Sequence, residues 1–174
     1  MLRARKGVDW TRYLPAEDLP YLHEQIDPDG WYPMATFERL GNAILAAIAS
    51  GNLDAVRIWG RMSLDQLRAT HPQIIAPGDP LESLNRFRVF RSTFFDFDAL
   101  EVVFFHEGEA QIAIDYQMRM PAEEAASVQT LGFFERLVDL AGGLNVWADL
   151  TGRSWKGEPR TLLKLRWQSP LTSR

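Results

Sequence analysis

The ten residues from Glu109 to Met118, EAQIAIDYQM, decide the fold class of this chain. Apolar side chains fall at every second position, and polar or small ones lie between them. A period of two is typical of a β-strand with one buried face, because successive side chains of a strand point to opposite sides of the sheet. The positions that we expect to be buried are Ala110, Ile112, Ile114, Tyr116 and Met118.

A second strand precedes this one across a tight turn at Glu107-Gly108. It covers residues 100–105, where apolar side chains occupy both faces toward the end of the run. Such a run is typical of a strand inside a sheet, so we predict a central strand here. The aromatic side chains of residues 89–97 fit neither the helical nor the strand period, and both a helix and a strand stay open for that segment.

A long helix follows the two strands. Pro121 suits its first turn, two glutamates lie near its positive end, and Gly142-Gly143 ends it. Two further strands, near residues 144–150 and 163–167, complete the unit. Two hairpins joined by one helix predict an α+β fold, in which a four-stranded, largely antiparallel sheet (β-β-α-β-β) is covered by the helix 121–141.

The region before the sheet is mainly helical. A first helix ends at Gly51, and Asn52 is placed to cap a second one. Gly60-Arg61 breaks the apolar pattern, and Ser63 to Gln66 reads as a capping box that begins a separate short helix. Asp79-Pro80 begins another helix by its cap and first-turn proline. We therefore expect helical hairpins packed beside the sheet.

These parts make one domain of 174 residues. We divide it into a peripheral N-terminal segment (1–30), a mainly helical part (31–92) and the sheet unit (93–168). The run Asp27-Pro28-Asp29-Gly30 is read as a turn rather than a calcium loop, because the later ligand positions of such a loop are missing.

The composition excludes several classes of function. The hydrophobic share of 46% and the charged share of 24% are ordinary for a globular protein. A net charge of -4 argues against a nucleic-acid partner. The absence of cysteine excludes disulfides and thiolate chemistry. The basic residues 1–6 lack the apolar core of a signal peptide, and no apolar run is long enough to span a bilayer, so a cytoplasmic location is expected.

The sequence offers no catalytic set. Asp96 and Asp98 are read as turn residues, because no further ligand at metal-binding spacing supports them. Glu101 and His106 would lie on opposite faces of one strand unless a bulge intervenes, so we expect no acid–base pair. No serine sits in a nucleophile elbow, and no glycine-rich loop opens a helix after a strand. We therefore predict no catalytic residue and no metal site.

The aromatic residues of the sheet unit have two open interpretations. They form the core of the domain, or they line a pocket for an apolar ligand between the helix 121–141 and the sheet. The candidate pocket residues are Phe104, Tyr116, Phe134 and Trp147.

The N-terminal apolar stripes predict a symmetric homodimer, because one sheet with one covering helix leaves them unburied. Trp59 is the expected anchor at its centre. The alternative is that both stripes close the core of the monomer itself, and a protein partner is a further candidate. A monomeric mass in light scattering at micromolar concentration would contradict the dimer. The candidate interface residues are Phe37, Ile44, Trp59 and Trp155.

Several short motifs resemble those of a known group of domains. They are Trp31-Tyr32-Pro33, Gly60-Arg61, Leu100-Glu101-Val102, Gly142-Gly143 and Ser154-Trp155-Lys156-Gly157. On these residues and on the order of the elements, the stretch 30–168 is similar to the architecture of haem-NO-binding domains, 4-vinyl reductase domains and Bet3-like transport-particle subunits. Within that group it most resembles a large paralogous family of uncharacterised myxobacterial proteins. The resemblance implies a small-molecule sensor or an interaction module, often a dimer, without catalysis.

The haem-binding members of that group carry a Tyr-x-Ser-x-Arg signature after the hairpin. The corresponding run here is Tyr116-Gln117-Met118-Arg119-Met120, in which methionines replace the serine and the arginine. Arg119 is one position off and would point to the other face of a strand. An axial ligand is needed as well, and the histidine candidates are His23, His71 and His106. We therefore expect no cofactor.

Two functions remain. The first is a non-enzymatic interaction or regulatory module that serves as a scaffold or signalling adaptor. The alternative is a small-molecule sensor that binds an apolar ligand, other than haem, in the pocket between the helix 121–141 and the sheet.

Overall fold

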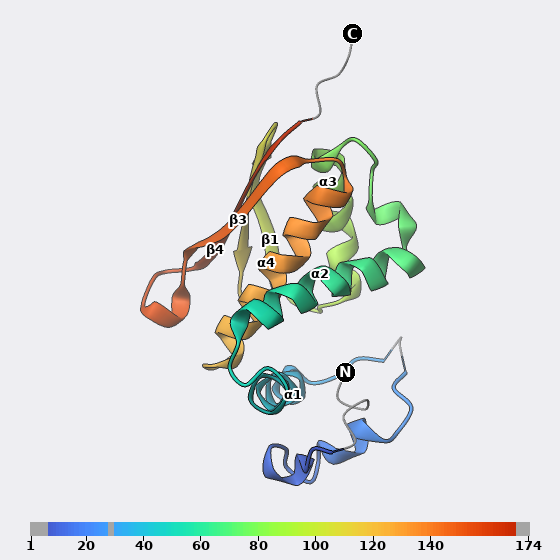
Figure 1. Cartoon of the computed structure of the whole chain (residues 1–174), viewed down its shortest axis with the longest axis vertical. Helices are drawn as coiled ribbons and strands as arrows, with labels where there is room; N and C mark the ends of the chain where they lie inside the picture. Colours follow the sequence, from blue (N-terminus) through green and yellow to red (C-terminus); the bar gives the residue numbers. More distant parts are fainter. Residues whose placement is uncertain (1–6, 28–29, 170–174) are drawn as a thin grey trace.

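The computed structural model describes residues 7–27 and 30–169. The centre of the turn expected at residues 27–30 and the basic residues 1–6 lie outside these ranges. The helices and strands are α1 (Met34–Ala47), α2 (Leu53–Thr70), α3 (Pro80–Phe90), β1 (Leu100–His106), β2 (Glu109–Ile114), α4 (Ala122–Leu140), β3 (Leu144–Gly152) and β4 (Thr161–Gln168) (Figure 1). Short 3₁₀ turns lie at Trp10–Arg12, Leu19–Leu22, Pro72–Ile74, Arg91–Thr93 and Ser154–Lys156.

The four strands form one sheet of order β1-β2-β4-β3, in which all neighbours are antiparallel. Helix α4 lies along one face of this sheet, as Figure 1 shows, and it contacts both β3 and β4. The apolar side chains of β2 and β4 and the buried face of α4 belong to one hydrophobic core. The predicted α+β fold with a sheet covered by the helix 121–141 is confirmed.

Strand β1 lies at an edge of the sheet, so its prediction as a central strand was wrong. Its apolar residues are explained locally instead. A bulge at Val103 interrupts the pairing with β2, and Phe104 then lies half in solvent on the outer face. The guanidinium of Arg88 covers the ring of Phe105 at 5.7 Å. On the free edge, Arg91 donates a hydrogen bond to the carbonyl oxygen of Leu100.

The alternation in β2 places Ile112 and Ile114 in the core, where both side chains are buried. The strand ends at Ile114, so its predicted extension to Met118 was wrong; residues 115–120 form a loop, in which Tyr116 is still buried. We expect Ile114→Ala to lower the free energy of unfolding by about 2–5 kcal/mol, because the lost apolar contacts leave a cavity. Denaturant unfolding measures this loss, and Val89→Ala is the control, since Val89 is 71% exposed. A loss no larger than that of the control would mean that the side chain of Ile114 is not part of the core.

Helix α2 runs without interruption from Leu53 to Thr70, which corrects the predicted break at Gly60-Arg61 and the separate helix after it. Asn52 caps α2 as predicted, because its side chain accepts hydrogen bonds from the backbone of Asp54 and Ala55. Ser63 donates its hydroxyl hydrogen to the carbonyl of Trp59 inside the helix and caps nothing.

Gly60, which suggested the break, lies where α2 crosses α4. A Cβ on Gly60 would lie 1.9 Å from the carbonyl oxygen of Gln129 on α4, and one on Gly132 of α4 would lie 2.0 Å from that of Arg57. The two glycines therefore let α2 and α4 approach backbone to backbone. Ion pairs flank the crossing, among them Arg57–Glu135 at 2.9 Å.

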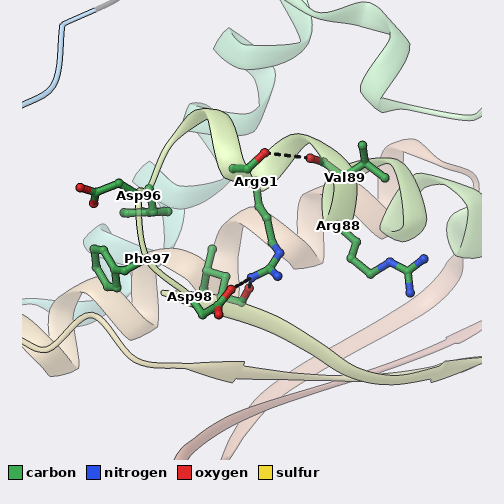
Figure 2. A pocket seen from close by; sticks show the side chains of 9 residues that line it. Arg88, Val89, Arg91, Asp96, Phe97 and Asp98 are labelled. Atoms are coloured by element: carbon green, nitrogen blue, oxygen red, sulfur yellow. Dashed lines mark hydrogen bonds and ion pairs between the residues drawn. The ribbon is translucent and has the colours of Figure 1, made fainter.

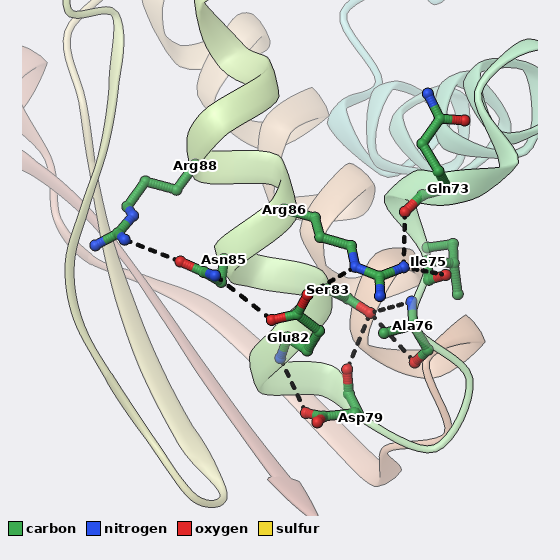
Figure 3. A network of polar contacts seen from close by, with 9 residues as sticks. All are labelled: Gln73, Ile75, Ala76, Asp79, Glu82, Ser83, Asn85, Arg86 and Arg88. Atoms are coloured by element: carbon green, nitrogen blue, oxygen red, sulfur yellow. Dashed lines mark hydrogen bonds and ion pairs between the residues drawn. The ribbon is translucent and has the colours of Figure 1, made fainter.

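Helix α3 begins as predicted at Asp79-Pro80, where the Asp79 carboxylate accepts a hydrogen bond from the backbone N–H of Glu82. Figure 3 shows the surrounding polar network, in which the buried Ser83 hydroxyl accepts from the N–H of Ala76. The segment 89–97, for which a helix and a strand were both open, is neither throughout. Helix α3 ends at Phe90, a 3₁₀ turn follows, and residues 94–97 are irregular.

The N-terminal segment packs on α1. Leu14 and Leu22 form a small apolar cluster with Ala43 of that helix. Beside it the Asp18 side chain, only 1% exposed, pairs with the guanidinium of Arg39, whose Nη2 lies 2.9 Å from Oδ1. Hydrogen bonds from Arg39 lower the pKa of the Asp18 carboxyl below its usual value. This pair fixes the segment to the rest of the chain.

One further prediction can be checked at the end of α4, and another concerns the lengths of all the helices. Gly142 has a left-handed backbone, with φ of +96°, so the predicted stop at Gly142-Gly143 is confirmed. Within the described ranges, none of the helices has the length and apolar composition that crossing a membrane requires.

Candidate functional site

A cavity of about 910 Å³ lies among the helices and the sheet end. Its walls come from the segment before α1 and the first turn of α1, from α2, from the end of α3 and the turn after it, and from α4. Leu100 and Tyr116, at the start of β1 and just after β2, close its floor. The described lining residues are Gly30, Trp31, Tyr32, Met34, Phe37, Ser63, Gln66, Leu67, Thr70, Phe87, Thr93, Phe94, Phe95, Leu100, Tyr116, Ala126, Gln129, Thr130, Phe133 and Phe134.

The described lining of this cavity is largely aromatic and uncharged. Nine of these twenty described residues are aromatic, and none is charged or a histidine. The remaining polar side chains are hydroxyls and carboxamides. A site of this size and composition suits an apolar small molecule that a few neutral polar groups orient.

Tyr116 carries the main polar contact of the cavity. Its hydroxyl lies 2.5 Å from that of Thr130, which itself donates to the carbonyl of Ala126 at 2.8 Å. Because the Thr130 hydrogen is used there, the Tyr116 hydroxyl is the donor of the pair. Burial raises the pKa of Tyr116 to about 12, so the phenol stays neutral at physiological pH.

The loop that carries Tyr116 is held by α4. The buried Glu123 carboxylate accepts a hydrogen bond from the N–H of Met118 at 3.3 Å, and Glu38 of α1 accepts one from the N–H of Arg119. Burial is the main cause that raises the pKa of Glu123. The loop 115–120 is therefore fixed to both α1 and α4, which positions the floor of the cavity.

The predicted pocket residues separate into two pairs. Tyr116 and Phe134 line the cavity, as expected for side chains between α4 and the sheet. Phe104 and Trp147 do not line it. Their partners across the strands, Gln111 and Arg166, alternate with the buried residues of β2 and β4, so both rings lie on the outer face of the sheet.

Sequence reasoning missed most of the aromatic wall. Trp31, Tyr32 and Phe37 come from the N-terminal half, and Phe94 and Phe95 come from the segment 89–97. The poor fit of residues 89–97 to either regular period was the one signal of their role, since a segment that lines a cavity need not follow a periodic pattern.

The predicted interface residues do not form one cluster. Trp59 packs against a small core of α1, α2 and α4, whereas Trp155 packs against the main core. Ile44 is half-buried in α1, and Phe37, 51% exposed, lies at the cavity. The homodimer stays a prediction.

A second cavity of about 410 Å³ lies between the end of α3 and β1, and Figure 2 shows its charged residues. Arg91 points toward Asp98 and forms an ion pair with it at 3.1 Å. Arg88 points away from this pair, and the Asp96 side chain points outward. The charges of this cavity do not converge on one point.

The bulge in β1 changes the expected relation of Glu101 and His106. Their partners, Ala113 and Glu109, lie on the same face of β2, so the two residues share the outer face. They do not interact: Glu101 pairs with Arg160 at 2.7 Å, and the ring of His106 packs on Phe104. Among the described residues, no group of three or more acidic or histidine side chains is placed to hold a metal ion.

The fold and cavity define the chain as an α+β domain in which a helical half and an antiparallel sheet enclose an aromatic cavity. Solved H-NOX structures share this architecture. An H-NOX domain from Shewanella oneidensis, a mutant in the Fe(II)CO ligation state, is 7% identical with a TM-score of 0.60, and the match covers 92% of this chain and 86% of that one. A mutant H-NOX from T. Tengcongensis is 11% identical, with a TM-score of 0.59, and the match covers 98% of this chain and 93% of that one.

A further structure, from work on haem distortion in the H-NOX family, has 11% identity and a TM-score of 0.63 over 99% of this chain and 94% of that one. At these identities the likeness establishes the fold alone. No protein-family model matches the sequence, and no curated protein matches it.

The cavity does not fit haem, the group studied in the last of these neighbours. His23, His71 and His106 all lie outside its lining, and none of the described lining residues is a cation that could meet the two carboxylates of haem. The two lining tyrosines are engaged elsewhere, Tyr116 with Thr130 and Tyr32 with the carbonyl of Asp27 at 3.0 Å.

Proposed function

We propose that this chain is a non-enzymatic sensor or regulatory domain that binds an apolar small molecule in the aromatic cavity. The observation that carries this proposal is the cavity itself, of about 910 Å³, with an uncharged and largely aromatic lining. The cavity opens to solvent, since Trp31 and Phe37 of its wall are 62% and 51% exposed, so a ligand can reach it from outside.

The position of the cavity supports a regulatory role. Its walls come from all four helices, and the helix α1 reaches the sheet unit mainly through α4. A bound molecule would touch both the N-terminal and the sheet-bearing parts of the chain. Occupancy would therefore stabilise one arrangement of these parts. A partner that binds this arrangement preferentially would then respond to the concentration of the ligand.

An interaction module without a ligand is the second candidate, and exposed aromatic residues favour it. Trp31 is 62% exposed, and Tyr32 and Phe37 lie beside it at the cavity with large exposed fractions. Exposed large apolar side chains that gather in one place mark contact sites for other proteins or ligands. A second copy of the chain, as in the predicted homodimer, is one such partner.

Native mass spectrometry of the freshly purified chain tests the proposed function. We expect a fraction of the protein to carry a small molecule that is released on unfolding. Ala126→Trp should abolish this species, because Ala126 lines the cavity and a tryptophan would fill part of it. Ala69→Trp, at an exposed site of α2 outside the cavity, is the matched control and should retain it. A bare dimer in the wild type would favour the interaction module instead.

A further inference from the structure

We infer that the ligand of this cavity is an uncharged aromatic molecule with a hydrogen-bond acceptor, held at that acceptor by the carboxamides of Gln66 and Gln129. This inference rests on the proposed function and specifies its ligand class. Three properties of the lining carry it: the absence of charge, the arrangement of the rings, and the state of the polar side chains.

Charge excludes the acids and amines. No arginine, lysine, histidine, aspartate or glutamate is among the described residues that line the cavity. A carboxylate or ammonium group seated against this lining loses part of its hydration and gains no counter-charge, which is unfavourable. Fatty acids, haem and charged metabolites are therefore poor ligands for this site.

The rings favour an aromatic ligand over an aliphatic one. Phe87, Phe133 and Phe134 lie 4.7–5.5 Å apart between centroids, at steep interplanar angles, and Phe95 meets Tyr116 at 5.7 Å. Rings in such edge-to-face groups offer further faces and edges at the spacing that another ring prefers. A planar aromatic molecule can extend this packing, whereas a flexible chain loses rotamer freedom without that gain.

The carboxamides are the polar groups still free to bind. The hydroxyls of Ser63 and Thr130 donate to carbonyls of their own helices, and Tyr116 donates to Thr130. Gln66 of α2, which is exposed, and Gln129 of α4, which is half-buried, line the cavity, and their amides make no hydrogen bond within the part of the chain that the structure describes. Each amide brings two N–H donors, so a carbonyl or ether oxygen of the ligand is the group they would hold.

Fluorescent probes that share one ring system test the charge and ring arguments. N-phenyl-1-naphthylamine is neutral, and 8-anilino-1-naphthalenesulfonate adds a sulfonate to the same skeleton. We expect the neutral probe to bind the full chain at least about ten-fold more tightly, a difference of about 1.4 kcal/mol. Dodecanol, neutral and aliphatic, should displace it poorly. Equal affinity for the two probes would overturn the charge argument, and efficient displacement by dodecanol would overturn the aromatic one.

The anchor is tested with a neutral naphthalene ketone, 6-propionyl-2-(dimethylamino)naphthalene, whose emission reports hydrogen bonding to its carbonyl. In the Gln66→Leu, Gln129→Leu double variant we expect its affinity to fall about ten-fold and its emission to shift to the blue, while binding of N-phenyl-1-naphthylamine stays unchanged. Gln73→Leu, on the exposed turn before α3, should change neither. Unchanged ketone binding in the double variant would overturn the anchor and leave the proposed function standing.

If the proposed function itself were wrong, these experiments would give a different set of results. Neither the wild type nor Ala126→Trp would bind a probe, and native mass spectra would show only bare protein. That result overturns both the function and the inference, whereas a charged or aliphatic molecule in the wild-type spectrum overturns the inference alone.

Discussion

Gly132→Ala is expected to lower the free energy of unfolding by about 3 kcal/mol or more, at the upper end of what overpacking costs. Its new Cβ would lie 2.0 Å from the carbonyl oxygen of Arg57, which is backbone and cannot rotate away. Helices α2 and α4 would have to separate along their whole contact. The flanking ion pair between Arg57 and Glu135 would lengthen with them.

Gly41→Ala is the matched control for this change. Gly41 also lies inside a helix, α1, but nothing is within 4 Å of the position that its Cβ would take. Alanine there should stabilise the chain by about 0.5–1 kcal/mol, because it favours the helical backbone without a clash. Denaturant unfolding of both variants gives the comparison. A Gly132 variant as stable as the Gly41 variant would mean that α2 and α4 do not meet backbone to backbone.

Arg39→Met is expected to cost about 3–5 kcal/mol at neutral pH, because it leaves the buried Asp18 carboxylate without its partner. The methionine keeps the length of the aliphatic stem, so the loss reports the ion pair rather than the packing of the side chain. The N-terminal segment 7–33 should then become accessible to proteases before the rest of the chain unfolds.

The stability difference between the wild type and Arg39→Met should depend on pH, because the pKa of Asp18 differs between the two proteins. In the wild type the pKa of Asp18 is lowered, so its contribution to stability is present above the unfolded value, near 3.8, and is lost as pH falls through the folded value. In the variant the unpaired, buried carboxyl has a raised pKa, so stability is lost as pH rises. The difference between the two proteins should therefore be full at pH 7 and shrink toward pH 3.

Arg12→Met is the control for Arg39. The pair of Arg12 with Asp9 at 3.2 Å is largely exposed on both sides, and such pairs contribute about 0–1 kcal/mol. If Arg39→Met cost no more than this, or if its cost did not depend on pH, Asp18 would not be a buried partner.

The sheet unit was predictable because local signals and tertiary packing agree there. The alternation from Ala110 to Ile114 and the glycine stop at Gly142 each demand one structure that the packing also needs. Helix α2 was not predictable in the same way. Its Gly60 is a poor helix former in isolation, and only the carbonyl of Gln129 on a helix seventy residues later explains it.

The candidate site was predicted in part for a related reason. Tyr116 and Phe134 were found because they lie on elements whose buried face the pattern reveals. Phe104 and Trp147 look like core residues in sequence, but both lie on the outer face of the sheet, and Trp147 is sheltered there by the guanidinium of Arg166 at 5.5 Å. Trp31 and Phe94 lie in segments without a period, so their convergence on one cavity follows only from the tertiary structure.

The capped edge of β1 has a consequence for how this protein behaves at high concentration. An exposed edge strand with Val103 and Phe104 beside it is a template on which strands of other copies can add and seed fibrils. Arg91 occupies the carbonyl of Leu100 on that edge, and the bulge at Val103 breaks the regular spacing that an incoming strand would need. The same arginine that fixes the turn after α3 thus hinders the addition of a strand at the β1 edge, whereas β3 forms the other edge of the sheet.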